Sequence, residues 1–76
     1  MKNGILDAET VGDRLRLLRG DRTIAEVSKS TGLSQSRIGN YERGVRLPND
    51  SAKSILANFY GVSVQKLFYT KEYNVK

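Results

Sequence analysis

Apolar residues recur at helical spacing in five short stretches of the 76-residue chain, and polar or capping residues separate these stretches. In the first stretch Val11, Leu15 and Leu18 repeat every three to four positions, and a glycine follows them. This spacing places apolar side chains on one face of a helix. Thr10 and Asp13 have the arrangement of a capping box, so we expect the first helix to begin there.

The next two helices are delimited by capping residues. Thr23 and Glu26 form a second capping box, and Gly32 is expected to end the helix that they open. Ser34 can cap a third helix, which Gly44 ends. Two helices joined by so tight a turn match the helix-turn-helix pattern, whose second helix enters the major groove of DNA.

The last two helices follow the longest connector, GVRLPND. Asn49 or Asp50 is expected to cap the fourth helix and Gly61 to end it, and Ser63 opens a short fifth helix. The fourth helix has a buried stripe of Ala52, Ile55, Leu56 and Phe59. The fifth helix can pack on the core through Val64, Leu67 and Phe68. The pattern predicts an all-α fold, a compact bundle of five short helices.

The length predicts one small domain. We expect residues 1–9 to form a flexible N-terminal arm, residues 10–69 the helix-turn-helix domain, and residues 70–76 a flexible C-terminal tail. The chain has neither cysteine nor histidine, which excludes a disulfide framework and the usual zinc sites and general bases. Its carboxylates are scattered and no glycine-rich phosphate loop is present, so we expect no enzyme, cofactor or metal.

Net charge and hydropathy narrow the class of partner. Thirteen Lys and Arg against eight Asp and Glu give a net charge of +5. Such a charge is typical of ordinary soluble domains, and it also fits the electrostatic footprint of a nucleic-acid-binding protein. No apolar run approaches the ~18 residues of a membrane span, and the start MKNGILDAE lacks the apolar stretch of a signal peptide. We therefore expect a cytoplasmic protein without a membrane partner.

The third helix has an unusual polar face. The face consists of Gln35, Ser36, Gly39, Asn40 and Arg43, while Ile38 and Tyr41 fall on the opposite side. Gln and Asn amides match the edge of adenine in the major groove, and Arg matches guanine or a phosphate. A merely solvated face is the alternative, but such faces favour Glu, Lys and Ala, which are absent here. Gly39 costs ~1 kcal/mol of helix propensity, as expected if a bulky partner approaches the backbone.

Residues 11–69 resemble the helix-turn-helix domain of phage-repressor-type regulators, the Cro/CI-like or XRE family. The match runs through VGDRLRLLRG, AEVSKSTGLSQSRIGNYERGVRLP and AKSILANFYGVSVQKLF. The resemblance implies a lambda-repressor-like fold and sequence-specific binding of double-stranded DNA. It further implies an intracellular transcription regulator, expected to repress a bacteriophage, mobile-element or similar bacterial operon.

The resemblance also implies contact residues. In that family the start and middle of the third helix contact bases, and the matching positions here are Gln35, Ser36, Gly39 and Asn40, with Arg37 at the edge of the face. Phosphate contacts are expected from Thr23, Ser34, Arg43, Arg46, Asn49 and Lys53. Many members carry Gln where this chain has Ile24, so either Ile24 joins the core or a neighbour takes over that phosphate.

Arg19 and Glu42 occupy positions at which similar proteins carry a partly buried ion pair. We expect a structural pair that orients the first and third helices, and the alternative is two independent surface charges.

A single domain contacts only a few base pairs, so we expect a homodimer on a pseudo-palindromic operator. Dimer contacts are expected from Leu67, Phe68 and Tyr69. Tyr60 and Tyr73, like Tyr69, are expected to pack or self-associate rather than stack on bases. The alternative function is a protein-interaction module of the same fold, an anti-repressor, antitoxin-like protein or modulator that binds a regulatory protein partner.

Overall fold

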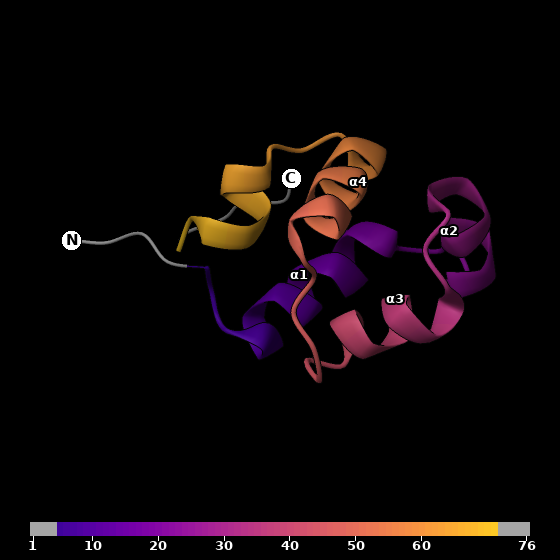
Figure 1. Cartoon of the computed structure of the whole chain (residues 1–76), viewed down its shortest axis with the longest axis horizontal. Helices are drawn as coiled ribbons and strands as arrows, with labels where there is room; N and C mark the ends of the chain where they lie inside the picture. Colours follow the sequence, from indigo (N-terminus) through magenta and orange to yellow (C-terminus); the bar gives the residue numbers. More distant parts are fainter. Residues whose placement is uncertain (1–4, 72–76) are drawn as a thin grey trace.

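The structure, a computed structural model, describes residues 5–71, which form five helical segments and contain no strand. The segments are α1 (Ala8–Arg19), α2 (Ile24–Thr31), α3 (Gln35–Glu42), α4 (Asp50–Tyr60) and a π-helical turn, η1 (Gln65–Tyr69). Figure 1 shows α2 and α3 at one end of the molecule and η1 at the other, with α1 between them. The all-α helix-turn-helix fold is thus confirmed. Residues 1–4 of the expected arm and 72–76 of the expected tail, Tyr73 included, lie outside the described residues.

The first helix begins three residues earlier than the sequence predicted. Its N-cap is Asp7, whose carboxylate accepts hydrogen bonds from the backbone N–H of Thr10 at 3.2 Å and from its hydroxyl at 2.8 Å. The prediction that Thr10 caps the helix with Asp13 is wrong because a carboxylate three residues upstream takes that role. Glu9 is consequently helical, and the backbone N–H of Leu6 donates to the carbonyl of Phe68 at 2.8 Å.

The other helix starts follow the predicted caps. Thr23 and Glu26 make both bonds of the capping box, at 3.1 and 2.9 Å. The hydroxyl of Ser34 accepts from the backbone N–H of Arg37 at 3.1 Å. Asn49, rather than Asp50, caps α4. These bonds fix where α2, α3 and α4 begin, and they come from residues three positions apart.

One hydrophobic core joins all five segments. Its members are Val11, Leu15, Val27, Leu33, Ile38, Tyr41, Ala52, Leu56, Ala57, Leu67 and Phe68. α1 and α3 lie in close contact at Gly12, where an added Cβ would lie 2.5 Å from the carbonyl oxygen of Glu42 and 2.7 Å from that of Tyr41. Only glycine permits this distance, so Gly12 determines how α3 sits on the core.

The fifth segment is a π-helix rather than the expected α-helix. The backbone N–H of Thr70 donates to the carbonyl of Gln65 at 2.8 Å, a bond across five residues. Carbonyls in and just after this segment accept hydrogen bonds from Arg14, a buried residue of α1. Its guanidinium donates to the carbonyls of Lys66 and Lys71 at 2.9 Å each and to that of Leu67 at 3.4 Å. A carbonyl that is buried without a hydrogen-bond partner costs free energy. Because Arg14 bonds these carbonyls, the wide π-helical turn does not incur that cost.

Candidate nucleic-acid interface

The helix-turn-helix unit is fixed by hydrogen bonds around its turn. Gly32 adopts a left-handed conformation with φ of 83° and ends α2. The hydroxyl of Ser28 donates to the carbonyl of Leu33 at 2.6 Å, and the hydroxyl of Thr31 accepts from the N–H of Leu33 at 3.2 Å. The Leu33 side chain is itself buried in the core. The turn therefore sets the orientation of α3 relative to α2.

α3 separates a buried face from an exposed one, as its sequence predicted. Ile38 and Tyr41 are buried, while Gln35, Ser36 and Arg37 are exposed. The exposed residues lie in the first turn of α3, which begins at Ser34. The structure thus presents a hydroxyl, an amide and a guanidinium at the helix start.

The middle of the same face differs from the expectation. Gly39 is buried, and an added Cβ would lie 3.0 Å from Nη1 of Arg43. Nη2 of Arg43 donates to Oδ1 of Asn40 at 2.6 Å. The guanidinium of Arg43 therefore lies over Gly39, beside Asn40, rather than extending away from the helix.

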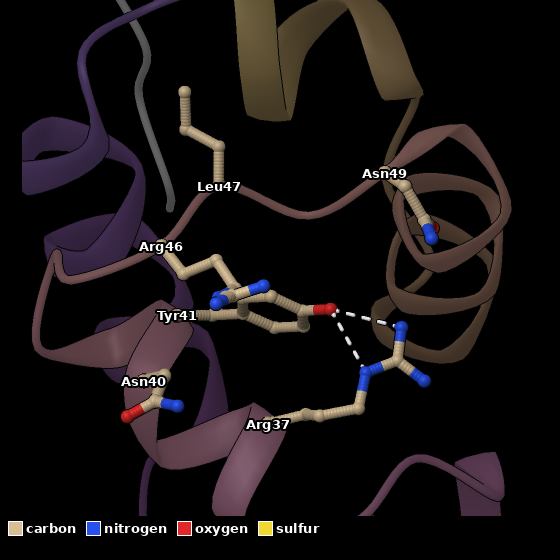
Figure 2. A pocket seen from close by; sticks show the side chains of 6 residues that line it. All are labelled: Arg37, Asn40, Tyr41, Arg46, Leu47 and Asn49. Atoms are coloured by element: carbon tan, nitrogen blue, oxygen red, sulfur yellow. Dashed lines mark hydrogen bonds between the residues drawn. The ribbon is translucent and has the colours of Figure 1, made fainter.

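A pocket of about 240 Å³ lies between α3 and the connector that follows it. Its lining residues are Arg37, Asn40, Tyr41, Arg46, Leu47 and Asn49 (Figure 2). Four of the six had been predicted to contact DNA, and the connector brings Arg46 and Asn49 beside α3. Nε and Nη2 of Arg37 donate to the hydroxyl of Tyr41 at 3.2 and 3.0 Å, as the dashed lines in Figure 2 show.

The polar atoms that remain in this pocket are hydrogen-bond donors. Oδ1 of Asn49 accepts from the backbone N–H of Ala52 at 2.8 Å, and Oδ1 of Asn40 accepts from Arg43. Each amide therefore offers its NH₂ group to a ligand, and the guanidiniums of Arg37 and Arg46 carry hydrogen-bond donors only. A pocket lined by donors and two cations, without a carboxylate, is suited to an anion.

Arg19 and Glu42 form a bidentate ion pair. Nε donates to Oε2 at 2.8 Å and Nη2 to Oε1 at 3.0 Å, and the Glu42 side chain is only 5% exposed. The hydrogen bond to this carboxylate raises the pKa of the Arg19 guanidinium. The pair connects the end of α1 to the end of α3, so the alternative of two independent surface charges does not hold.

Two predicted phosphate contacts are engaged elsewhere. The Lys53 residue is 9% exposed, and its Nζ donates to the hydroxyl of Tyr69 at 2.8 Å, with Asp50 at 3.5 Å. The hydrogen bond to Tyr69 raises the pKa of this ammonium. At the start of α2, the N–H of Thr23 already donates to the carboxylate of Glu26. Neither Lys53 nor Thr23 lines the pocket. Ile24, which stands where many similar proteins carry Gln, is partly buried and packs against the core.

The expected dimer contacts need correction. Leu67 and Phe68 are both 0% exposed, because they pack into the core of their own chain. They have no side-chain surface for a second copy, so this prediction is wrong for both. Tyr69 is half-buried and stays a prediction. Tyr60 packs edge-on against Phe59 with ring centroids 4.9 Å apart, in agreement with a packing role.

Sequence reasoning missed Gly12 and Arg14. Gly12 stands within a helix, where glycine is unfavourable, and that was the available signal. Arg14 had no local signal, since its partners are more than 50 residues away. Within residues 5–71, no group of side chains is arranged to hold a metal ion, and no helix is long and apolar enough to cross a membrane.

Comparisons with known proteins agree with this geometry. The family model described as "Helix-turn-helix" matches residues 14–67. The crystal structure of the restriction-modification controller protein C.AhdI from Aeromonas hydrophila is similar, with a TM-score of 0.74 and 30% identity over 82% of this chain and 97% of that one. The DNA-binding domain of BldD has a TM-score of 0.68 and 32% identity over 82% of this chain and 93% of its own. Among curated proteins, none matches the sequence at a significant level. The chain therefore belongs to the XRE-type helix-turn-helix family of DNA-binding transcription regulators.

Proposed function

We propose that this chain is a sequence-specific transcription regulator that places α3 in the major groove of duplex DNA. The observation that carries the proposal is the exposed first turn of α3, with Gln35, Ser36 and Arg37, next to the donor-lined pocket. Side chains at the start of such a helix are those that contact base edges in helix-turn-helix complexes. Gln35 can donate to and accept from one base simultaneously.

The pocket supplies the accompanying backbone contact. A phosphate of the DNA strand beside α3 is proposed to bind in this pocket, which Arg37, Arg46 and Asn49 line with donors. Charged donors to phosphate position the protein without selecting a sequence. Ser34, the N-cap of α3, is the other phosphate contact that we retain, whereas Lys53 is left out because of its bond to Tyr69.

A pair of chains is the proposed binding unit. An eight-residue helix contacts few base pairs, so tight binding takes two copies on half-sites about one helical turn apart, ~34–36 Å. The surface around Tyr69 is the proposed dimer contact. Occupying a promoter in this way would repress it, and a phage, mobile-element or similar bacterial operon is the proposed target. The family is typically non-enzymatic, and we propose no catalytic function.

Selection from random duplex DNA tests this function. The wild-type chain is expected to enrich a pseudo-palindrome, and Gln35→Ala to lower affinity for it by ~1–3 kcal/mol while relaxing one base position. Gln65→Ala is the matched control, since Gln65 is exposed on η1 at the other end of the molecule (Figure 1), and it should retain the preference. Arg46→Ala should weaken all sequences alike and reduce the salt slope by about one.

The opposite result would identify the alternative function. If binding is weak, steeply salt-dependent and the same for Gln35→Ala and Gln65→Ala, α3 does not contact bases. The fold would then serve to bind a protein partner, and the basic pocket would account for the residual affinity for DNA.

A further inference from the structure

Arg43 and Asn40 are joined on the exposed face of α3. The bond from Nη2 of Arg43 to Oδ1 of Asn40 is 2.6 Å long, and Nη1 of Arg43 lies 3.0 Å from the position of a Cβ on Gly39. The glycine thus provides the space into which the guanidinium folds. Gly39 is buried for this reason, although it lies on the solvent side of the helix.

This bond determines which end of the Asn40 amide a ligand meets. A guanidinium has five donors and no acceptor, so the amide oxygen must face Arg43 and the NH₂ group must face outward. Figure 2 shows the oxygen of Asn40 on the side away from the other labelled residues. The pair therefore presents the NH₂ of Asn40 and the remaining N–H groups of Arg43, all of them donors.

A surface of donors distinguishes between the purines. Adenine shows an acceptor and a donor in the major groove, and an unpaired Asn matches both of them. Guanine shows two acceptors, N7 and O6. The bond from Arg43 occupies one of the two lone pairs of the Asn40 oxygen and holds this oxygen toward the guanidinium. The usual contact with adenine therefore competes with a charge-assisted bond, which is stronger than a bond between neutral groups.

We propose that Asn40 and Arg43 act as one unit that selects guanine over adenine at the base pair nearest Asn40. Arg43 is then a specificity-determining residue. Gly39, which has no side chain, leaves the space in which the guanidinium of Arg43 lies against the helix. The inference rests on the proposed function, since it assumes that α3 enters the major groove. It reverses the expectation from sequence, in which Asn40 alone favours adenine.

The test is a selection from random duplex DNA with four forms of the full chain. Asn40→Ala identifies the position concerned, as the one at which the base preference relaxes. At that position the wild type should enrich guanine. Arg43→Met should raise the ratio of adenine to guanine roughly 5- to 150-fold, the discrimination of one bidentate contact, because the freed amide can then match adenine. Lys66→Met removes the same charge from exposed η1 and should leave that ratio unchanged.

Three outcomes overturn the inference while the proposed function stands: adenine enriched at this position by the wild type, an unchanged ratio in Arg43→Met, or no position affected by Asn40→Ala. Failure of the wild type to enrich any sequence would instead refute the proposed function, and this inference with it. Thermal unfolding of each variant verifies that it folds, and the exposed position of Arg43 predicts melting close to that of the wild type.

Discussion

Replacing Gly12 with alanine should destabilise the fold, although alanine is the better helix former. The new Cβ would lie 2.5 Å from the carbonyl oxygen of Glu42 and 2.7 Å from that of Tyr41. Contacts between carbon and oxygen are ordinarily no shorter than ~3.3 Å, so α1 and α3 must separate by about 0.8 Å at this point. The atoms in the way are backbone, which cannot rotate aside.

The magnitude follows from two opposing effects. Overpacking costs ~1–3 kcal/mol, and a clash with two backbone carbonyls belongs at the upper end of that range. The gain in helix propensity is at most ~1 kcal/mol. We therefore expect Gly12→Ala to lower the free energy of unfolding by about 2 kcal/mol, or Tm by roughly 10 °C for a domain of this size.

Chemical and thermal unfolding followed by circular dichroism measure this change, and the chain supplies its own control. Gly39→Ala makes the same substitution in α3, where the nearest atom is the mobile end of Arg43. That variant should gain up to ~1 kcal/mol. If Gly12→Ala melts at or above the wild-type temperature, α1 and α3 do not pack as closely as the structure shows and the reasoning is wrong.

Three further predictions concern single contacts. Arg14→Met keeps the apolar stem but leaves the carbonyls of Lys66, Leu67 and Lys71, in and just after η1, without this donor, and should lower the urea-unfolding free energy by about 1–3 kcal/mol; no change would contradict the role of the guanidinium. Glu42→Gln breaks the ion pair with Arg19 and should cost about 3 kcal/mol in the same assay, whereas a loss under 0.5 kcal/mol would mean a solvent-screened pair. Hydrogen bonds from the side chain and then the backbone of Thr10 lower the pKa of Asp7 below its usual value of 3.8. The ionised Asp7 therefore stabilises the fold above about pH 3.8, and this stabilisation is lost as the pH falls through the lower pKa of the folded state. Asp7→Asn should lack this contribution, and the difference in Tm between it and the wild type should shrink between pH 6 and pH 3; a constant difference would refute the assignment.

The helix starts could be predicted from sequence because capping is local. Thr23, Ser34 and Asn49 each bond a residue three positions away, and nothing distant in the fold decides the outcome. The wrong prediction for the start of α1 also has a local cause. Both Asp7 and Thr10 can act as N-cap, and in the structure Asp7 is the cap and accepts hydrogen bonds from Thr10. The π-helical form of η1 was beyond prediction because Arg14, which bonds its carbonyls, lies on another helix.

The candidate site was predictable only in part, for the same physical reason. Helical spacing alone separates Gln35 from Ile38, so the two faces of α3 follow from sequence. The pocket depends on how the connector folds back on α3, which brings Arg46 and Asn49 to Arg37. The sequence led us to expect that a bulky partner approaches the backbone at Gly39, and it could not show that the side chain of Arg43, from the end of the same helix, lies over this position.

The two glycines of the α1–α3 region have different consequences for experiments on DNA binding. Gly12 and the ion pair of Glu42 position α3 from its buried side, so variants at these residues would lose DNA binding through a displaced helix. Loss of affinity at such positions is therefore no evidence of a contact. Gly39 and Arg43 lie on the outer side, where a substitution can change base preference without lowering Tm. A change in the preferred base at constant stability is the result that distinguishes a residue that contacts DNA from one that holds the helix in place.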